Sequence, residues 1–364
     1  MRLGIIGGGQ LGRMLALAAQ PMGIRVSVVD PTADTPAAVV AEHLQADFSD
    51  ETALAQLAAR SDVVTFEFEN VPDSAARLLQ DARPVFPPPE ALRVAQERWV
   101  EKSAFVELGI DTPRFFRVDN EAELRHAFAQ LGQLVLKTRR GGYDGKGQAV
   151  IRDTAALERA IVEFAGIPCI AEELVSFQRE LSVVVCRGRD GSTVVYPLAE
   201  NRHRGGILRE SIAPAPDVSP ALAAQAEEWG RRLTAHFGYV GVLALELFQV
   251  GDRLLANEFA PRVHNSGHWT IEGARTSQFE NHVRAVCGLP LGDASALCPT
   301  AMLNCIGRMP DAAAVLAITD THVHDYGKEP RAERKVGHVT VRAPSHAELN
   351  ERIAALLALW PADG

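Results

Sequence analysis

Two glutamates in alternating apolar segments are the residues most clearly able to do chemistry. Glu246 lies in ALELFQV and Glu258 in LLANEFAPRVHNSGHWT, and both segments have the period-two pattern of a β-strand. Gly251 and Asp252 between them predict the turn of a β-hairpin. Carboxylates brought together in this way repel each other unless a cation lies between them. Because oxygen ligands beside phosphate suit Mg²⁺, we expect the hairpin to bind magnesium and a phosphate-rich partner.

Side chains that bind anions or form hydrogen bonds cluster around the second glutamate. They are Asn257, Arg262, His264 and Asn265. The plainer interpretation is an edge hairpin whose acids are simply solvated. So many polar groups in an otherwise apolar strand pair favour a binding site instead.

A strand lysine followed by a glycine-rich basic loop is a second candidate site. The apolar segment 134–137 ends at Lys137, and TRRGGYDGKGQ follows before the strand pattern resumes at 149–152. Main-chain N–H groups and lysines in such a loop suit a polyphosphate. The spacing differs from that of a Walker A motif, and the alternative is a plain hairpin connection. We favour phosphate binding because the strand lysine leads directly into the basic loop.

Further acids and a histidine lie in the predicted strands downstream. Segment 167–175 reads IPCIAEELV and could join two lobes, offering main-chain groups to a base and an acid to a ribose. Glu180 opens the next predicted strand, 180–186, and His203 precedes a Gly–Gly turn and strand 206–211. A lone histidine is more often a hydrogen-bonded structural residue than a ligand, so His203 alone predicts no site.

The N-terminal segment has the pattern of a βαβ unit with a glycine turn. Predicted strand 3–6 leads into GGGQLG, and predicted helix 13–20 and strand 25–30 follow. Such glycines let the backbone approach a phosphate at a helix N-terminus. The pattern therefore predicts a phosphate at this turn, whereas NAD is only one of several ligands that such a turn can serve.

Two acids follow the third predicted strand. Glu67 and Glu69 lie at the carboxyl end of strand 62–66, where ligands bind in a doubly wound parallel sheet, although a charged loop is an equal alternative. The proline-rich segment 84–89 then predicts a domain boundary.

One amphipathic helix is predicted over 91–108, ended by Gly109. Arg98 and Lys102 share one face of it, and by default such charges are solvated. In the C-terminal segment the predicted elements are helix 278–287, strands 323–326 and 338–342, and helix 348–359. His322 and His324 share a strand face, but without a third ligand they predict no metal.

The bulk composition of the 364 residues, with 47% hydrophobic and 23% charged, is that of an ordinary globular protein. The net charge of −9 argues against nucleic-acid binding, which usually needs a basic stripe. Five cysteines include no C-x-x-C pair and fit a reduced, cytoplasmic setting. No run approaches about 18 apolar residues and no signal peptide is evident, so we expect no membrane association.

The order of these motifs resembles that of the ATP-grasp ligases. The matching pieces are Lys137, the GGYDGKGQ loop, EELV, Glu180, Glu246 and Asn257–Glu258. GGGQLGRM, EFEN, NRHRGGILRESIAPA, NEFAPRVHNSGHWT and YGKEPRAERKVGH narrow the resemblance to the N5-carboxyaminoimidazole ribonucleotide synthetases, biotin-free ATP-dependent carboxylases of bacterial and fungal purine synthesis. The resemblance spans residue 2 to about 342.

The fold class implied by this resemblance is α/β in three parts. They are a Rossmann-like preATP-grasp substrate domain over 1–97, a two-lobed ATP-grasp domain over 98–275 with its small lobe at about 111–175, and a small β-rich C-terminal domain over 276–364 that completes the substrate site.

The resemblance also implies ATP with Mg²⁺ or Mn²⁺, and neither biotin nor NAD. The residues implied around ATP are Arg98, Lys137, Gly142, Tyr143, Asp144, Gly145, Lys146, Gly147, Gln148, Glu172, Glu173, Leu174, Val175, Glu180, His203, Asn257 and Glu258. Glu246 and Glu258 would hold the metal. The residues implied in the chemical steps are Lys137, Tyr143, Asp144, Arg262, His264 and Asn265, the last three facing bicarbonate and the carboxyphosphate made from it.

The family resemblance places the ribonucleotide at both ends of the chain. Gln10 and Leu11 would contact it in place of a dinucleotide, so the glycine turn misleads about the ligand. Glu67 or Glu69 would meet its ribose. Its 5′-phosphate would lie on basic residues of the C-terminal connector, which otherwise reads as a solvated turn: Lys328, Arg334 and Lys335. Ala332–Glu333 stands where family members often carry Pro-Gly, which leaves the local turn geometry open.

The implied reaction converts ATP, bicarbonate and 5-aminoimidazole ribonucleotide into N5-carboxyaminoimidazole ribonucleotide, ADP and phosphate. Asp144, which would orient the aminoimidazole, and His264 are both candidates to take the amine proton. Relatives are typically homodimers. The alternatives are a formate-dependent glycinamide ribonucleotide transformylase, a catalytically silent nucleotide-binding module and an NAD-dependent dehydrogenase. The last rests on the glycine turn and the acid after it, namely Gly7, Gly9, Gly12 and Asp30.

Overall fold

A four-stranded parallel sheet with helices on both faces forms the N-terminal unit of the computed structural model, which describes residues 1–142 and 146–360. Its strands, in the order β3-β2-β1-β4, are β1 (Arg2–Ile6), β2 (Arg25–Asp30), β3 (Glu42–Gln45) and β4 (Val63–Phe66). Its helices are α1 (Gln10–Ala19), η1 (Gln20–Met22), η2 (Pro36–Val39), α2 (Glu51–Arg60) and α3 (Asp73–Ala82). Leu3 and Ile5 pack on the side of α1, whereas Ile6 and Phe66 pack on the side of α2 and α3. This is the predicted Rossmann-like arrangement.

The predicted single helix over 91–108 is wrong, because two helices occupy this segment. They are α4 (Pro89–Ala95) and α5 (Arg98–Glu107). Glu97 between them has extended backbone angles, and its carboxylate accepts hydrogen bonds from the N–H groups of Trp99 and Val100. A capping acid inside an apolar periodic pattern ends one helix and starts the next without disturbing the pattern itself.

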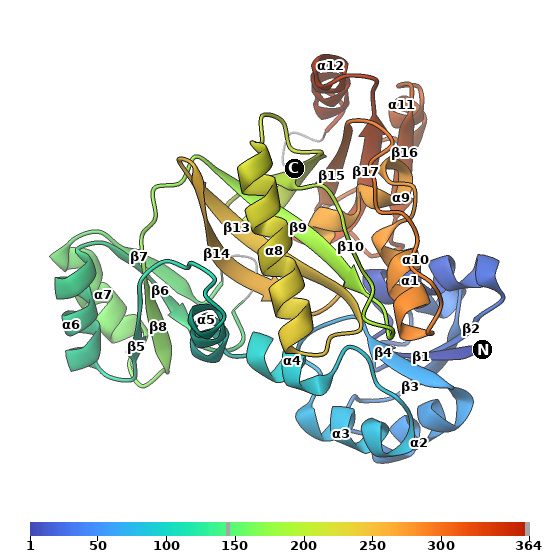
Figure 1. Cartoon of the computed structure of the whole chain (residues 1–364), viewed down its shortest axis with the longest axis horizontal. Helices are drawn as coiled ribbons and strands as arrows, with labels where there is room; N and C mark the ends of the chain where they lie inside the picture. The colour runs from blue at the N-terminus through green and yellow to red at the C-terminus, as the bar shows by residue number, and fades with distance from the viewer. Residues whose placement is uncertain (143–145, 361–364) are drawn as a thin grey trace.

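The small lobe is a four-stranded antiparallel sheet whose core is closed by two helices. Its elements are β5 (Phe115–Val118), α6 (Glu121–Leu131), β6 (Leu134–Thr138), β7 (Gln148–Ile151), α7 (Thr154–Glu163) and β8 (Cys169–Glu173). The strands run in the order β5-β8-β6-β7, so the predicted glycine-rich loop joins the neighbouring strands β6 and β7. The lobe projects from the rest of the molecule at the left of Figure 1.

A nine-stranded antiparallel sheet runs through the rest of the chain in the order β14-β13-β9-β11-β12-β15-β17-β16, with β10 paired to β9. Its strands are β9 (Arg179–Arg187), β10 (Thr193–Val195), β11 (Ala199–Arg204), β12 (Ile207–Ala213), β13 (Gly241–Val250), β14 (Arg253–Ala260), β15 (Thr300–Ile306), β16 (Thr321–Asp325) and β17 (Lys335–Arg342). The second and third predicted domains, divided at residue 275, therefore share one continuous sheet.

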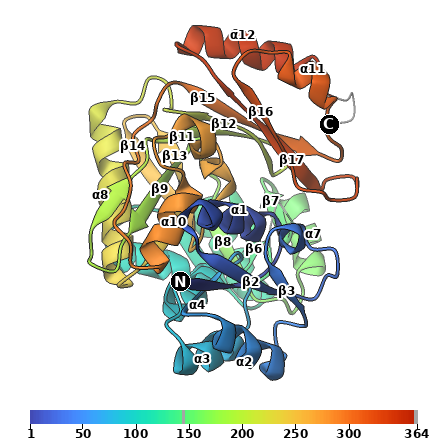
Figure 2. The ribbon, with the colours of Figure 1, turned by 90° about the vertical axis from the view of Figure 1, so that its right-hand side faces the viewer.

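Helices cover both faces of this sheet. They are α8 (Pro220–His236), α9 (Thr270–Gly273), α10 (Gln278–Val286), α11 (Ala312–Leu316) and α12 (His346–Leu357), with a short 3-10 helix, η3 (Asn265–Gly267). Helix α8 packs on one face, and α10 packs on the other and also contacts α1. Figures 1 and 2 show α1 and α10 side by side, so α10 joins the N-terminal unit to the large sheet.

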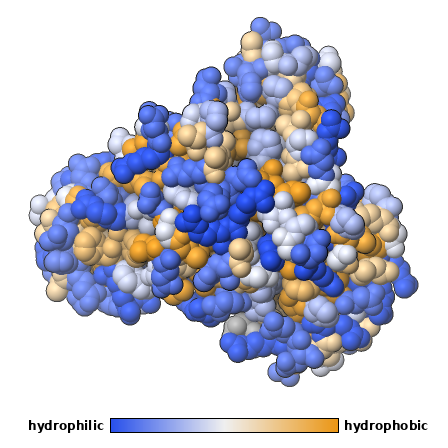
Figure 3. Space-filling model, viewed as in Figure 1, coloured by the Kyte–Doolittle hydropathy of each residue, from blue (hydrophilic) through white to orange (hydrophobic). Residues whose placement is uncertain are grey.

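The space-filling view has a three-lobed outline that matches the small lobe, the N-terminal unit and the C-terminal strands (Figure 3). Within residues 1–142 and 146–360, no helix is long and apolar enough to cross a membrane. All five cysteines are free thiols, and burial raises the pKa of Cys169 to about 11 and of Cys305 to about 12. These two thiols are therefore poor nucleophiles at neutral pH.

Candidate active site

A cavity of 690 Å³ lies where the N-terminal unit, the small lobe and the large sheet meet. The predicted site residues that line it are Gln10, Leu11, Glu67, Glu69, Arg98, Lys137, Gly142, Lys146, Gln148, Glu180, His203, Glu246, Asn257, Glu258, Arg262, His264, Asn265 and Lys335. A more open hollow of 910 Å³ at the N-terminal ends of β1 and β2 contains none of the predicted site residues. Segments far apart in the sequence thus converge on one space.

Some predicted residues do not line this cavity. Those that the structure describes are Gly147, Glu172, Glu173, Leu174, Val175, Lys328 and Arg334. The side chain of Glu173 is partly exposed and forms an ion pair with Arg114 at 3.0 Å. Tyr143, Asp144 and Gly145 lie outside the described residues. For all of these residues, contact with ATP or the ribonucleotide stays a prediction.

The glutamate hairpin is confirmed as a structural element. β13 and β14 pair antiparallel around the predicted turn, and Glu246 and Glu258 are direct cross-strand partners. Glu258 forms an ion pair with Arg98 at 2.6 Å, and Glu246 lies 3.1 Å from Nε2 of His264. Burial favours the neutral form of Glu258, but Arg98 and Lys137 outweigh it and lower its pKa to about 2. Arg98 therefore holds the carboxylate of Glu258, and His264 holds that of Glu246.

The interpretation of Lys102 as a solvated helix charge is wrong. Its side chain is 1% exposed, and Nζ lies 3.3 Å from Oε2 of Glu172 and 3.0 Å from Oγ1 of Thr112. The same Glu172 oxygen lies 3.1 Å from Nζ of Lys137. Burial opposes the charge on Glu172, yet the two lysines together lower its pKa. Lys102 therefore lies inside the molecule, and its partner Glu172 also holds Lys137, the lysine predicted to meet phosphate.

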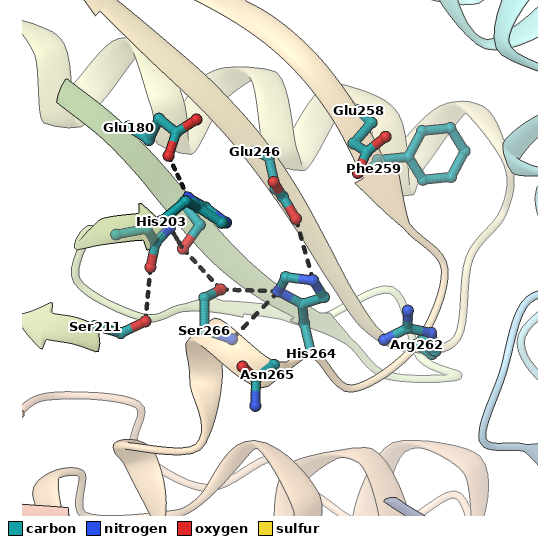
Figure 4. Close-up of polar contacts among 12 residues, drawn as sticks. Glu180, His203, Ser211, Glu246, Glu258, Phe259, Arg262, His264, Asn265 and Ser266 are labelled. Atoms are coloured by element: carbon teal, nitrogen blue, oxygen red, sulfur yellow. Dashed lines mark hydrogen bonds and ion pairs between the residues drawn. The ribbon is translucent and has the colours of Figure 1, made fainter. Parts of the chain in front are cut away.

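A histidine–glutamate pair lies on the large sheet that also carries Glu246. His203 on β11 contacts Glu180 on β9, and both side chains line the cavity (Figure 4). Burial opposes protonation of the imidazole, but Glu180 outweighs this effect and raises the pKa of His203. The Glu180 carboxylate therefore favours the protonated form of the His203 imidazole at the cavity wall.

The N–H groups of three glycines in the glycine turn are engaged by acids of the chain itself, so the prediction of a phosphate there loses support. The N–H groups of Gly9 and Gly12 both donate to the carboxylate of Glu67, and the N–H of Gly8 donates to Asp30 at 2.8 Å. A β-carbon added at Gly9 would lie 2.6 Å from that carboxylate, so the glycines make room for an internal acid. Because both oxygens of Glu67 are engaged by the main chain, its predicted contact with a ribose loses support.

Glu69, two residues farther along, has a different environment. Its carboxylate pairs with the guanidinium of Arg262. Burial favours the neutral acid, but Arg262 outweighs it and lowers the pKa of Glu69 to about 2. Arg262 is thereby held at the cavity wall with a fixed orientation.

The C-terminal connector reaches the N-terminal helix. Lys328 donates to Oε1 of Gln10, and burial together with Arg334 lowers the pKa of Lys328 to about 8. The turn is closed by the N–H of Arg334 donating to the carbonyl of Arg331 at 3.0 Å. Glu333 adopts φ of 61°, in the left-handed region that favours glycine. The turn therefore forms despite the altered dipeptide, but with a strained backbone.

Sequence reasoning missed the residues that support the site from behind. The side chains of Asn265 and Asn304 exchange two hydrogen bonds of 3.1 and 2.5 Å, and Asn304 also donates to the carbonyl of Leu208. Asn304 is 1% exposed. Its signal in the sequence is a single amide inside the apolar strand AMLNCI, where a buried polar group needs a partner. The partner itself is visible only in the fold.

Three family models together match most of the chain. They are the ribonucleotide synthetase preATP-grasp domain at residues 1–96, the ATP-grasp domain at 103–279 and the phosphoribosylaminoimidazole carboxylase C-terminal domain at 300–352. This agreement confirms the predicted three-part α/β fold class.

Named relatives and solved structures are similar over nearly the whole chain. An N5-carboxyaminoimidazole ribonucleotide synthase of Pseudomonas aeruginosa is 51% identical over 360 residues, covering 99% of both chains. The crystal structure of the synthetase from Thermus thermophilus has a TM-score of 0.95 at 50% identity, covering 98% of both chains. A synthase from Aspergillus clavatus in complex with ADP and 5-aminoimidazole ribonucleotide has a TM-score of 0.91 at 33% identity, covering 98% of both chains.

Proposed function

The chain belongs to the N5-carboxyaminoimidazole ribonucleotide synthase family of ATP-grasp ligases, and we propose that it carboxylates 5-aminoimidazole ribonucleotide with ATP and bicarbonate. The observation that carries this proposal is the shared cavity. Lys137 of the small lobe, Glu258 of the large sheet, Arg262 just after β14, and Gln10 of the N-terminal unit all line it. A nucleotide, a small anion and a ribonucleotide could therefore meet there.

The first step would join bicarbonate to phosphate. An oxygen of bicarbonate attacks the γ-phosphorus of ATP, and the bond to the bridging oxygen breaks, so that ADP leaves and carboxyphosphate forms. Lys137 neutralises charge on the phosphates, and Lys102 and Glu172 hold it in place. His203, oriented by Glu180, would supply a further hydrogen-bonding group at the nucleotide end of the cavity.

Glu246 and Glu258 would hold Mg²⁺, with Mn²⁺ as an alternative. Two cross-strand carboxylates lining one cavity are oxygen ligands of the kind that Mg²⁺ takes from proteins, so these residues fit the ion. When bound, it screens the negative charge of the phosphates. The chain would then have to release Glu258 from Arg98, whose guanidinium would be free to meet phosphate.

The second step would transfer the carboxyl group. The exocyclic amine of the ribonucleotide attacks the carbon of carboxyphosphate, or of CO₂ released from it, while the bond to the phosphate oxygen breaks. Phosphate leaves, and the amine gives up one proton, for which Asp144 and His264 are the candidate acceptors. Arg262 and Asn265 would bind the carboxylate oxygens, because both line the cavity and both are fixed by a partner behind them.

The ribonucleotide would lie between the two ends of the chain. Gln10 and Lys335 line the cavity, and Lys328 joins Gln10 from the connector. A cluster of basic groups suits the 5′-phosphate. Glu69 is the better candidate for the ribose, because Glu67 is engaged by the glycine turn.

The test is ADP release by the full chain with ATP and Mg²⁺. We expect release that requires 5-aminoimidazole ribonucleotide and increases with bicarbonate. Formate with glycinamide ribonucleotide is the comparison arm, and turnover there alone would contradict the proposal. No turnover in either arm would leave the fold without this activity.

Two further properties are proposed from the family. A homodimer is expected, and the mass measured by sedimentation equilibrium would check it. A cytoplasmic location is expected from the substrates, and fractionation of cells that express the protein would check it.

A further inference from the structure

A row of small polar side chains crosses the large sheet on the face that carries Glu246. Ser211 on β12, Asn201 on β11 and Ser182 on β9 are 0%, 5% and 1% exposed. Ser211 is the cross-strand partner of Asn201, and Ser182 is the cross-strand partner of Glu246. Buried polar groups cost free energy unless each is hydrogen-bonded, so such a row in an apolar sheet requires a reason.

The row is one continuous chain of hydrogen bonds that ends at a histidine. Ser211 Oγ donates to Asn201 Oδ1 at 2.7 Å, and Asn201 Nδ2 donates to Ser182 Oγ at 3.0 Å. Ser182 Oγ donates to Ser266 Oγ at 2.8 Å, and Ser266 Oγ lies 2.9 Å from Nδ1 of His264 (Figure 4). Each hydroxyl has a single proton, so a chain in this direction leaves the Ser266 proton for Nδ1.

The main chain gives the same direction independently. The N–H of Ser266 donates to Nδ1 of His264 at 3.3 Å, and a main-chain N–H can only donate. Nδ1 must therefore be an acceptor, which leaves the ring proton on Nε2. Nε2 lies 3.1 Å from Oε1 of Glu246, an acceptor for that proton. Gln278 clamps the histidine backbone, accepting from its N–H at 3.0 Å and donating to its carbonyl at 2.7 Å.

We propose that Ser266 and Ser182 are positioning residues that hold His264 with its proton on Nε2, so that His264 donates a hydrogen bond to Glu246 and accepts no proton from the substrate. The only acceptor nitrogen of the ring is occupied by Ser266, and the other nitrogen already carries a proton. The inference rests on the proposed function only where it concerns the proton that the amine of the ribonucleotide loses. Of the two residues that the sequence offers for the amine proton, this geometry removes one.

The first experiment reads the proton position directly. The full chain is labelled with ¹⁵N in its histidine rings, and the signals of His264 are identified by their loss in His264→Gln. Long-range ¹⁵N–¹H correlation spectra should give an unprotonated Nδ1 and a protonated Nε2 without any substrate. A protonated Nδ1, alone or together with Nε2, would overturn the proposal. This result does not depend on whether the chain carboxylates the ribonucleotide.

The second experiment removes the support. Ser266→Ala should shift His264 toward a mixture of the two tautomers and lower kcat/KM for bicarbonate by about tenfold, the usual effect of an outer hydrogen-bond partner. KM for ATP should stay unchanged. The matched control is Ser61→Ala, a buried serine whose Oγ donates to the carbonyl of Leu57 in the N-terminal unit. An unaltered tautomer and an unaltered kcat/KM in Ser266→Ala would contradict the positioning role.

The third experiment separates donation from proton acceptance. In His264→Gln the side-chain amide can still donate to Glu246 but cannot take a proton, so kcat should stay within about tenfold of the original. Loss of a true general base would cost roughly 10²–10⁴-fold, and a loss of that size in His264→Gln would refute the inference. His264→Leu, which has no donor, should be the weaker enzyme. If the original chain shows no ribonucleotide-dependent ADP release, the proposed function fails while the spectra still decide the tautomer.

Discussion

The glycine turn of the N-terminal unit and the glutamate hairpin of the large sheet both carry groups suited to charged ligands, but they face different partners. At the turn, the N–H groups of Gly9 and Gly12 are taken up by Glu67 of the same unit. At the hairpin, Glu246 and Glu258 line a cavity and are held by side chains from other segments. The glycine turn therefore has a structural role, because Glu67 occupies the N–H groups that could have bound a phosphate. The hairpin acids are candidates for a binding site, because they line a cavity.

The largest expected effect tests the hairpin. Glu258→Gln should lower the rate of ADP release by about 100-fold or more, because one carboxylate of the proposed metal pair is lost. Thermal unfolding should change little in comparison. The matched control is Glu227→Gln on α8, an exposed acid paired with Arg231 at 2.9 Å, which should leave the rate unchanged. Full activity in Glu258→Gln would remove the metal assignment.

At the glycine turn, loss of the acid should reduce the stability of the fold. Glu67→Gln places an amide NH₂ against a main-chain N–H, so the free energy of unfolding should fall by about 2 kcal/mol. Urea unfolding measures this, with the exposed Glu51→Gln on α2 as the control, expected within about 0.5 kcal/mol. Protection of the original chain by NAD in a melting assay would break the comparison, because a dinucleotide would then bind where the acid lies.

The two acids that follow β4 sharpen the comparison. Burial raises the pKa of Glu67, whereas Arg262 outweighs burial and lowers that of Glu69 from 4.5 to about 2. A folded pKa below the unfolded one stabilises the fold above pH 4.5, and this stabilisation is lost as the pH falls toward 2.

Urea unfolding at about pH 7 and about pH 3 would measure the contribution of Glu69. The loss of stability between these pH values should be smaller in Glu69→Gln than in the original chain by about 2 kcal/mol. This is less than the full linkage value, because a folded carboxyl with a pKa of about 2 is still mostly ionised at about pH 3. Equal losses in both chains would contradict the pairing with Arg262.

The smallest effect concerns the connector that reaches the glycine turn. Glu333 has φ of 61°, where a β-carbon is strained, so Glu333→Gly should raise the free energy of unfolding by about 1 kcal/mol. Glu333→Ala removes the exposed contact with Lys146 at 4.0 Å but keeps the strain, and it should give no gain. A gain of the same size in both variants would assign the effect to charge instead of backbone.

Local patterns were sufficient for much of the fold and for part of the site. The hairpin with its turn at Gly251 and Asp252 and the strand that carries Lys137 follow from periodicity and turn residues. The helix break at Glu97 escaped this reasoning, because a capping side chain can interrupt a helix without interrupting the apolar period. Lys102 was misjudged because Glu172 and Thr112, which enclose its ammonium group, come from other segments of the chain.

The sequence by itself determined many of the strands and helices, which family the order of motifs resembles, and which residue types could bind phosphate or a metal. Only the tertiary structure decided the partners of those residues. Glu67 turns to Gly9 across 58 positions, Arg98 to Glu258 across 160, and Lys328 to Gln10 across 318. Periodicity specifies which face of an element is buried, but the element opposite that face depends on how the sheets stack and cross over.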